Sequence, residues 1–125
     1  MRDAENVGDE PLVVNVDEVV EEDNRDPRNP RFGSFDKILT PGMRERGGRL
    51  GLVLTRVPPG RTACPFHTHT HEDEIFYIIS GRGVLRYGDT LVSLRPGDCV
   101  SCPAGTGVAH QIANNSEEDL CYLSM

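Results

Sequence analysis

From Arg49 onward the sequence consists of short apolar runs, separated by turn-forming residues at intervals of about eight to twelve residues. Glycine, proline, asparagine and aspartate stand between the runs, as in Gly81-Arg82-Gly83 and Pro103-Ala104-Gly105. No segment of useful length here has the apolar period of about 3.6 residues that marks a helix. Closely spaced strands of this kind predict an all-β sandwich or small barrel. The expected strands cover residues 50–57, 74–80, 84–87, 91–94, 99–102, 110–113 and 120–123.

The length and charge limit what the chain can be. Its 125 residues are enough for one domain, and the formal charge of -7 argues against nucleic acid or an anionic membrane as a partner. No apolar run approaches the roughly 20 residues that a transmembrane helix needs. The N-terminus lacks the basic and then apolar pattern of a signal peptide, so we expect a cytoplasmic location.

The first 48 residues are more polar than the rest. We expect them to form a short, irregular N-terminal extension, and residues 49–125 to form the barrel. Within the extension, residues 12–16 could be a short edge strand and residues 17–23 a brief acidic helix or a solvated loop. Residues 24–30 contain two prolines and two asparagines and predict an irregular turn.

Three of the four histidines, His67, His69 and His71, lie within five residues of one another. On a strand, His67 and His69 would present two imidazoles on one face, about 6.6 Å apart along the chain, which is a workable arrangement for one metal ion. Glu74 would face the opposite way if that strand continued, but the polar residues 70–73 can form a turn that brings Glu74 in from the next strand. A His-x-His pair in an acidic stretch is, by itself, more often a solvated loop.

The run after Glu74 predicts a central strand, because it is aromatic and β-branched throughout. Phe76 and Ile78 share the parity of Glu74 and should face the interior, whereas Tyr77 should face outward. The fourth histidine, His110, begins a later strand. If the barrel brings that strand opposite the first pair, three imidazoles and one carboxylate meet, which suits Fe(II), Mn(II), Ni(II) or Zn(II) better than Mg(II) or Ca(II).

Two spaced motifs carry a family resemblance. Gly60, His67-x-His69, Glu74 and Gly81 resemble the first signature motif of the cupin superfamily, and Gly97, Pro103-x-Gly105, His110 and Asn114 resemble the second. Two gaps depart from the usual spacing: the one from Gly60 to His67 is longer, and so is the one from Gly105 to His110. The chain thus resembles a small single-domain cupin of the type 2 conserved-barrel kind.

The resemblance implies a cupin-type double-stranded β-helix, or jelly-roll barrel, around a divalent transition metal. The ligands that it implies are His67, His69, Glu74 and His110, with Fe or Mn favoured and Ni or Zn possible. It further implies a small-molecule enzyme of dioxygenase, decarboxylase or isomerase type. The alternative is a non-catalytic module that binds a metal or a small ligand. His71, Phe76 and Ile78 are candidates for residues that support the ligands or line the pocket.

The remaining expectations concern the cysteines and the oligomeric state. Cys99 and Cys102 are three residues apart on a predicted strand, so their thiols should face opposite ways, and we interpret them as small buried apolar residues rather than a zinc site. The apolar residues 12–16 and the outward face of the strand 74–80 could be covered by a second subunit. We therefore predict a homodimer with exchange of an N-terminal strand.

Overall fold

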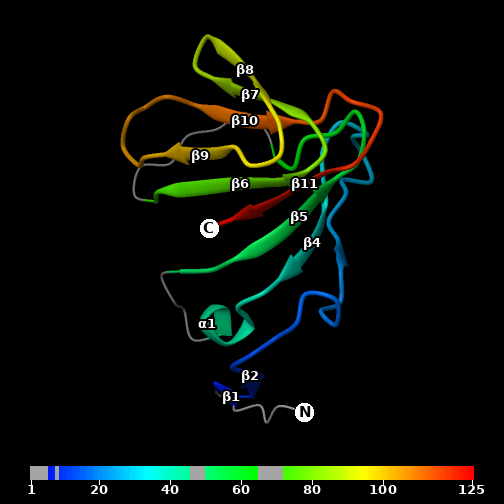
Figure 1. Cartoon of the computed structure of the whole chain (residues 1–125), viewed down its shortest axis with the longest axis vertical. Coiled ribbons are helices and arrows are strands. Elements are labelled where there is room, and N and C mark those ends of the chain that lie inside the picture. Colours follow the sequence, from blue (N-terminus) through cyan, green and yellow to red (C-terminus); the bar gives the residue numbers. More distant parts are fainter. Residues whose placement is uncertain (1–5, 8, 46–49, 65–71) are drawn as a thin grey trace.

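In the computed structural model, residues 6–7, 9–45, 50–64 and 72–125 are described (Figure 1). They form a nearly all-β protein, and α1 is a helix of five residues. None of the described segments forms a helix with the length and apolar character to span a membrane. In chain order the elements are β1 (Asn6–Val7), β2 (Glu10–Pro11), β3 (Glu22–Asp23), β4 (Phe35–Ile38), α1 (Pro41–Glu45), β5 (Val53–Val57), β6 (Glu74–Ser80), β7 (Gly83–Tyr87), β8 (Thr90–Leu94), β9 (Cys99–Cys102), β10 (His110–Ala113) and β11 (Leu120–Ser124).

The strands form two antiparallel layers that face each other. The larger sheet has six strands in the order β3-β4-β5-β11-β6-β9, and the smaller has three in the order β10-β7-β8. An isolated antiparallel bridge between Thr62 and Ala113 adds the chain after β5 to the edge of the smaller sheet. The order is non-sequential, as expected for a jelly roll. The strands predicted from Arg49 onward are confirmed, with ends that shift by three residues at most.

The core lies between the two sheets and follows the strand alternation. On β6, Phe76 and Ile78 are buried, whereas Ile75, Tyr77 and Ile79 are each more than 40% exposed. The predicted parity of this strand is therefore correct. Val57 and Leu120 join Ile78 as fully buried apolar side chains of this core.

Glycine is required where the chain turns tightly between β6 and β7. Gly81 has a φ of 81°, which favours glycine, and a Cβ built on it would collide with the carbonyl oxygen of Asp119. The close approach of the Asp119 backbone therefore depends on a residue without a side chain.

The N-terminal half differs from its prediction in detail. Residues 12–16 form no strand. Residues 17–21 form an exposed turn and loop, which agrees with the solvated-loop alternative and not with an acidic helix, and residues 22–23 form the short strand β3. Apolar content alone did not suffice at residues 12–16, because no strand in the described part of the chain pairs with them. Residues 24–30 are irregular, as predicted. Strands β3 and β4 extend the six-stranded sheet, whereas β1 and β2 pair with each other at the far end of the molecule (Figure 1).

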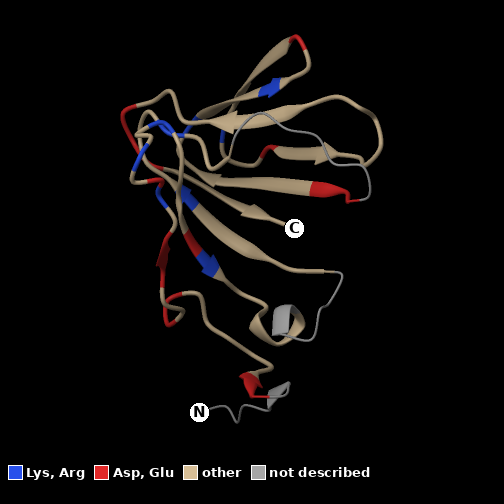
Figure 2. Ribbon diagram, turned by 180° about the vertical axis from the view of Figure 1, so that it is seen from behind, with Lys and Arg blue, Asp and Glu red and all other residues tan. Residues whose placement is uncertain are grey.

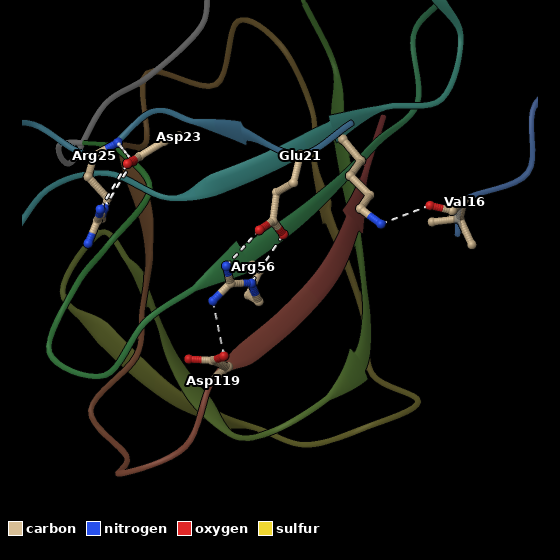
Figure 3. Close-up of polar contacts among 7 residues, drawn as sticks. Val16, Glu21, Asp23, Arg25, Arg56 and Asp119 are labelled. Atoms are coloured by element: carbon tan, nitrogen blue, oxygen red, sulfur yellow. Dashed lines mark hydrogen bonds and ion pairs between the residues drawn. The ribbon is translucent and has the colours of Figure 1, made fainter. Parts of the chain in front are cut away.

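On the outer face of the larger sheet, charged side chains connect the chain just before β3 to β5. Arg56 on β5 forms a two-pronged ion pair with Glu21, with N–O distances of 2.7 and 3.1 Å, and a third contact of 3.2 Å with Asp119 (Figure 3). The ring of Phe35 lies under the guanidinium groups of both Arg56 and Arg25, at 4.1 and 4.6 Å. Elsewhere, charged residues lie mainly in loops and at strand ends (Figure 2).

Candidate metal centre

One end of the barrel brings together a carboxylate and an imidazole from the two opposing sheets. Glu74 is the first residue of β6 in the larger sheet, and His110 is the first residue of β10 in the smaller one. His110 Nε2 lies 2.9 Å from Glu74 Oε1, so the two groups are hydrogen-bonded. The His110 side chain is 5% exposed and that of Glu74 is 24% exposed. The pair therefore lies inside the barrel but remains open to solvent on the Glu74 side.

Aromatic rings form the wall next to this pair. The ring of Phe76, two residues along β6 from Glu74, meets the His110 ring edge-on at 6.0 Å. The same Phe76 ring meets the Tyr122 ring edge-on at 5.6 Å, from β11. Ile78 lies one step deeper and is fully buried, so it belongs to the core. Phe76 thus supports the position of the imidazole directly.

Two thiols lie near the Glu74 carboxylate. Cys102 on β9 is the cross-strand partner of Glu74 and is buried. Cys64 retains exposed surface, yet desolvation of its thiol, with a smaller effect of the Glu74 charge, raises its pKa to about 11. Burial and Glu74 likewise raise the pKa of Cys102. Both thiols therefore stay protonated near neutral pH, which makes them poor nucleophiles.

The C-x-x-C pair is partly as predicted. Cys99 and Cys102 do point to opposite faces of β9, since Cys99 is exposed and Cys102 is buried. The prediction that both would be buried is wrong for Cys99. It lies on the outer face of the edge strand β9, opposite Tyr77, where nothing in the described part of the chain covers it fully.

Sequence reasoning missed a polar row on the inner face of the larger sheet. Asp36, Thr55 and Tyr122 are cross-strand neighbours on β4, β5 and β11. Thr55 Oγ1 donates a hydrogen bond of 2.8 Å to Asp36, and Tyr122 is 3% exposed. Burial raises the pKa of Tyr122 well above its usual value, and the nearby Cys64, Asp36 and Glu74 add to that shift. Asp36 was missed because it lies in the segment expected to be irregular, and Tyr122 was missed because its neighbours depend on the strand order.

Asn114, the last residue of the second motif, has a structural role. Its side chain is 1% exposed and donates hydrogen bonds to the carbonyl oxygens of Val57 and Glu118, at 2.8 and 2.7 Å. This ties the end of β5 to the loop before β11.

The other predicted ligands, His67 and His69, and the neighbouring His71 lie outside the described residues. The chain on either side of residues 65–71 is fixed by contacts. Gln111 donates a hydrogen bond of 3.3 Å to the Cys64 carbonyl, and the Asp73 carboxylate accepts one of 2.8 Å from the Ala104 amide. Cys64 thus lies beside β10, which carries His110, and Asp73 directly precedes β6, which carries Glu74.

The described part of the centre fits a transition metal in its chemistry. It supplies one imidazole nitrogen and one carboxylate oxygen, which are donors that Fe, Mn, Ni and Zn accept. Within the described ranges, no group of three histidine, cysteine, aspartate or glutamate side chains is arranged to hold a metal. Glu74 and His110 are thus two donors of the four that the sequence motif contains.

Comparison with known proteins agrees with this architecture. One relative, named Oxalate-binding protein, from Thermotoga maritima, is 34% identical over 70 residues. The match covers 56% of this chain and 55% of the relative, so the aligned part spans about half the length of that protein. The binding of oxalate that this name states is a property of the relative.

Solved structures resemble the chain over most of its length. A candidate sugar phosphate isomerase from Acidithiobacillus ferrooxidans superposes with a TM-score of 0.76 at 28% identity, over 87% of this chain and 68% of that one. A protein described as a predicted oxalate decarboxylase, also from Thermotoga maritima, gives a TM-score of 0.69 at 25% identity, over 90% and 96% of the two chains. The family model described as Cupin domain matches residues 53–125, more than half of the sequence. With its two antiparallel sheets and the Glu74–His110 pair between them, the chain belongs to the cupin family.

Proposed function

We propose that this protein is a metal-dependent cupin enzyme acting on a small molecule, with one divalent metal held by His67, His69, Glu74 and His110. The observation that carries the proposal is the contact of 2.9 Å between Glu74 and His110, which joins residues 36 positions apart from opposite sheets. A carboxylate and an imidazole brought together from opposite sheets, with the carboxylate open to solvent, are side chains of the kind that bind metals.

The donor set determines which metals are suitable. Three imidazole nitrogens and one carboxylate oxygen favour Fe or Mn in this family, with Ni and Zn as further candidates. When bound, such a metal supplies Lewis-acid or redox chemistry at coordination positions left open to a substrate. Phe76 holds the His110 ring in place and Ile78 fills the space beneath. His71 is assigned to the support of the ligands or to solvent, and not to the metal itself.

The names of the similar proteins favour decarboxylase or isomerase chemistry on an oxygen-rich small molecule, and a dioxygenase is the third candidate. A non-catalytic ligand-binding module is the alternative function, because the relative from Thermotoga maritima is named for binding alone. We propose a small-molecule ligand in either case, with no nucleic acid or membrane partner and a cytoplasmic location.

Elemental analysis of the purified full chain tests the metal proposal. We expect about one equivalent of Fe, Mn, Ni or Zn in the unmodified protein, and loss of that metal in His69→Ala and in Glu74→Ala. His71→Ala is the matched control and should keep the metal. Full occupancy in both of the first two variants would contradict the ligand assignment. Oxygen uptake and product analysis with enolizable acids, sugars and oxalate then separate enzyme from binding module.

We also propose a homodimer. Leu12, Val13 and Val16 are between 37% and 59% exposed, although they are apolar. Val14, in the same segment, lines an open hollow of about 590 Å³ together with Val20 and Ile38. The outer face of β6 adds Ile75, Tyr77 and Ile79, each more than 40% exposed. Exposed apolar surface of this extent favours a protein partner. Light scattering that gives a mass near 27.6 kDa, twice the 13.8 kDa of the chain, supports the dimer, and a clean monomer contradicts it.

A further inference from the structure

The open hollow of about 590 Å³ lies at the end of the molecule that carries β2 and α1 (Figure 1). Its lining is mainly apolar and includes Val14, Val20 and Ile38, together with the carboxylates of Glu10 and Glu22. Val20 is 82% exposed, the highest value among the large apolar side chains that the structure describes. Apolar surface that is hollowed and uncovered in this way favours contact with another protein surface.

The chain around the hollow is strongly acidic. Residues 9–23 contain seven Asp and Glu residues and neither Lys nor Arg. In the described part of the chain, ion pairs with arginine neutralise two of these seven, Glu21 and Asp23. Lys37 lies nearby, but its ammonium group donates to the carbonyl oxygen of Val16. The hollow therefore suits an occupant that combines apolar side chains with positive charge.

The hairpin of β7 and β8 has these properties, and it lies at the opposite end of the long axis (Figure 1). Leu91 is 70% exposed and Val92 is 44% exposed, so both faces of β8 are uncovered at this point. Leu91 is the cross-strand neighbour of Arg86, which is also exposed, so an apolar side chain and a guanidinium group share the outer face. Residues 82–95 contain three arginines and one aspartate, which gives the hairpin a positive charge.

A second copy of the chain can bring these two surfaces together. Within one chain they lie at opposite ends and cannot meet (Figure 1). A two-fold axis across the long axis sets the hairpin of each subunit against the hollow of the other, so the same contact forms twice. The exposed apolar residues 12–16, on which the proposed homodimer rests, are continuous in sequence with the lining of the hollow.

We propose that the β7–β8 hairpin of one subunit docks in the acidic hollow of a second copy of this chain. Leu91 then covers apolar surface of the hollow, and Arg86 lies beside Glu10 or Glu22. This inference rests on the homodimer proposed above and names the two surfaces that form it.

One aspartate on each surface tests the contact. Leu91→Asp changes the hairpin and Val20→Asp changes the hollow, and both positions are exposed, so the fold of the full chain should be kept. Light scattering over a dilution series gives the Kd of the dimer. Because each variant alters both copies of the contact, we expect a Kd at least about 10-fold weaker than that of the unmodified protein. Leu50→Asp, at a position 62% exposed, is the matched control and should leave the Kd unchanged.

Mixing the two variants is the sharper test. Each variant alone has one damaged surface in every contact. An equimolar mixture can form a dimer in which the intact hollow of the Leu91→Asp chain receives the intact hairpin of the Val20→Asp chain. We therefore expect dimers in the mixture at a concentration at which either variant alone is monomeric.

Charge exchange tests the pairing of Arg86 with the hollow. Arg86→Glu should weaken the dimer about 3- to 10-fold, and Glu22→Arg in the same chain should restore it. Glu117→Arg makes the same change of charge at an exposed position elsewhere and should not restore it.

The outcomes separate this inference from the homodimer itself. A monomeric unmodified protein contradicts the homodimer before any variant is made. A dimer whose Kd neither Leu91→Asp nor Val20→Asp weakens leaves the homodimer in place and overturns the docking of the hairpin in the hollow. The docking is equally overturned if the mixture of the two variants stays monomeric, or if Glu117→Arg restores the Arg86→Glu dimer as well as Glu22→Arg does.

Discussion

Thr55 Oγ1 donates a hydrogen bond of 2.8 Å to Asp36 Oδ1 and thereby joins β5 to β4 on the inner face of the barrel. The other oxygen of Asp36 accepts hydrogen bonds from Ser34 and Asn24, at 2.9 and 2.8 Å. No arginine or lysine in the described residues forms an ion pair with Asp36. A partly buried carboxylate is thus held by three neutral donors, which satisfies its oxygens while leaving its charge in place.

Thr55→Val should therefore destabilise the fold. Valine keeps the shape of the side chain but removes one donor from the Asp36 carboxylate, and we expect a loss of about 1–3 kcal/mol in the free energy of unfolding. Urea unfolding monitored by circular dichroism measures it. Thr90→Val, the same exchange at an exposed position of β8, is the control and should change stability by less than about 0.5 kcal/mol. Equal effects in the two variants would contradict the role assigned to the Thr55 hydroxyl.

Asn114→Ala should be more damaging than its neighbour Asn115→Ala. The Asn114 side chain is almost fully buried and donates hydrogen bonds to the carbonyl oxygens of Val57 and Glu118. Alanine would leave both oxygens without this donor. We expect a loss of about 2–4 kcal/mol, since two buried acceptors are left without partners. Asn115 is exposed, so its replacement should have little effect. If the two variants unfold at the same denaturant concentration, these hydrogen bonds contribute nothing to stability.

The sequence predicted the barrel strands well because local signals there agree with the tertiary structure. The turn residues around the apolar runs placed the ends of β6 and β10. The alternation of side chains along a strand placed Phe76 inward and Tyr77 outward. The N-terminal half was harder to predict. Strand β4 forms because β5 offers it a hydrogen-bonding edge, and Lys37 and Asp36 give little local sign of this. Residues 12–16 have the composition of a strand, but none of the strands that the structure describes pairs with them.

The same reasoning explains what could be predicted of the candidate site. The spacing of two motifs pointed to Glu74 and His110, and the fold brings them together over 36 residues. The position of Tyr122 depends on which strand lies next to β5, a long-range choice that no local pattern in residues 120–124 encodes. Sequence spacing identifies side chains with strong chemical preferences, whereas a single phenol inside a barrel becomes visible only once the strand order is known.

Arg56→Ala should loosen the attachment of the chain around Glu21 and β3 to the larger sheet. Arg56 pairs with Glu21 and Asp119 and covers the ring of Phe35, and the ion pairs raise its own pKa. Because these groups are about one third exposed, we expect a modest loss of about 1–2 kcal/mol, part of which disappears in 1 M salt. Hydrogen exchange should become faster in residues 20–24. Arg82→Ala, at an exposed turn position, is the control, and an equal loss there would contradict the proposed clamp.

The ion pair between Asp23 and Arg25 makes a contribution to folding stability that depends on pH. Titration of the Asp23 carboxyl group measures this dependence directly. Side-chain and backbone hydrogen bonds from Arg25 lower the pKa of Asp23 to about 2, below its usual value of 3.8. Because the folded pKa is the lower one, the stabilising contribution is present above about pH 4 and is lost as the pH falls through 2. A carboxyl NMR titration should show this midpoint, and Arg25→Gln should return it toward 3.8. Arg28→Gln should leave it unchanged, and a midpoint near 4 in the unmodified protein would contradict the assigned pairing.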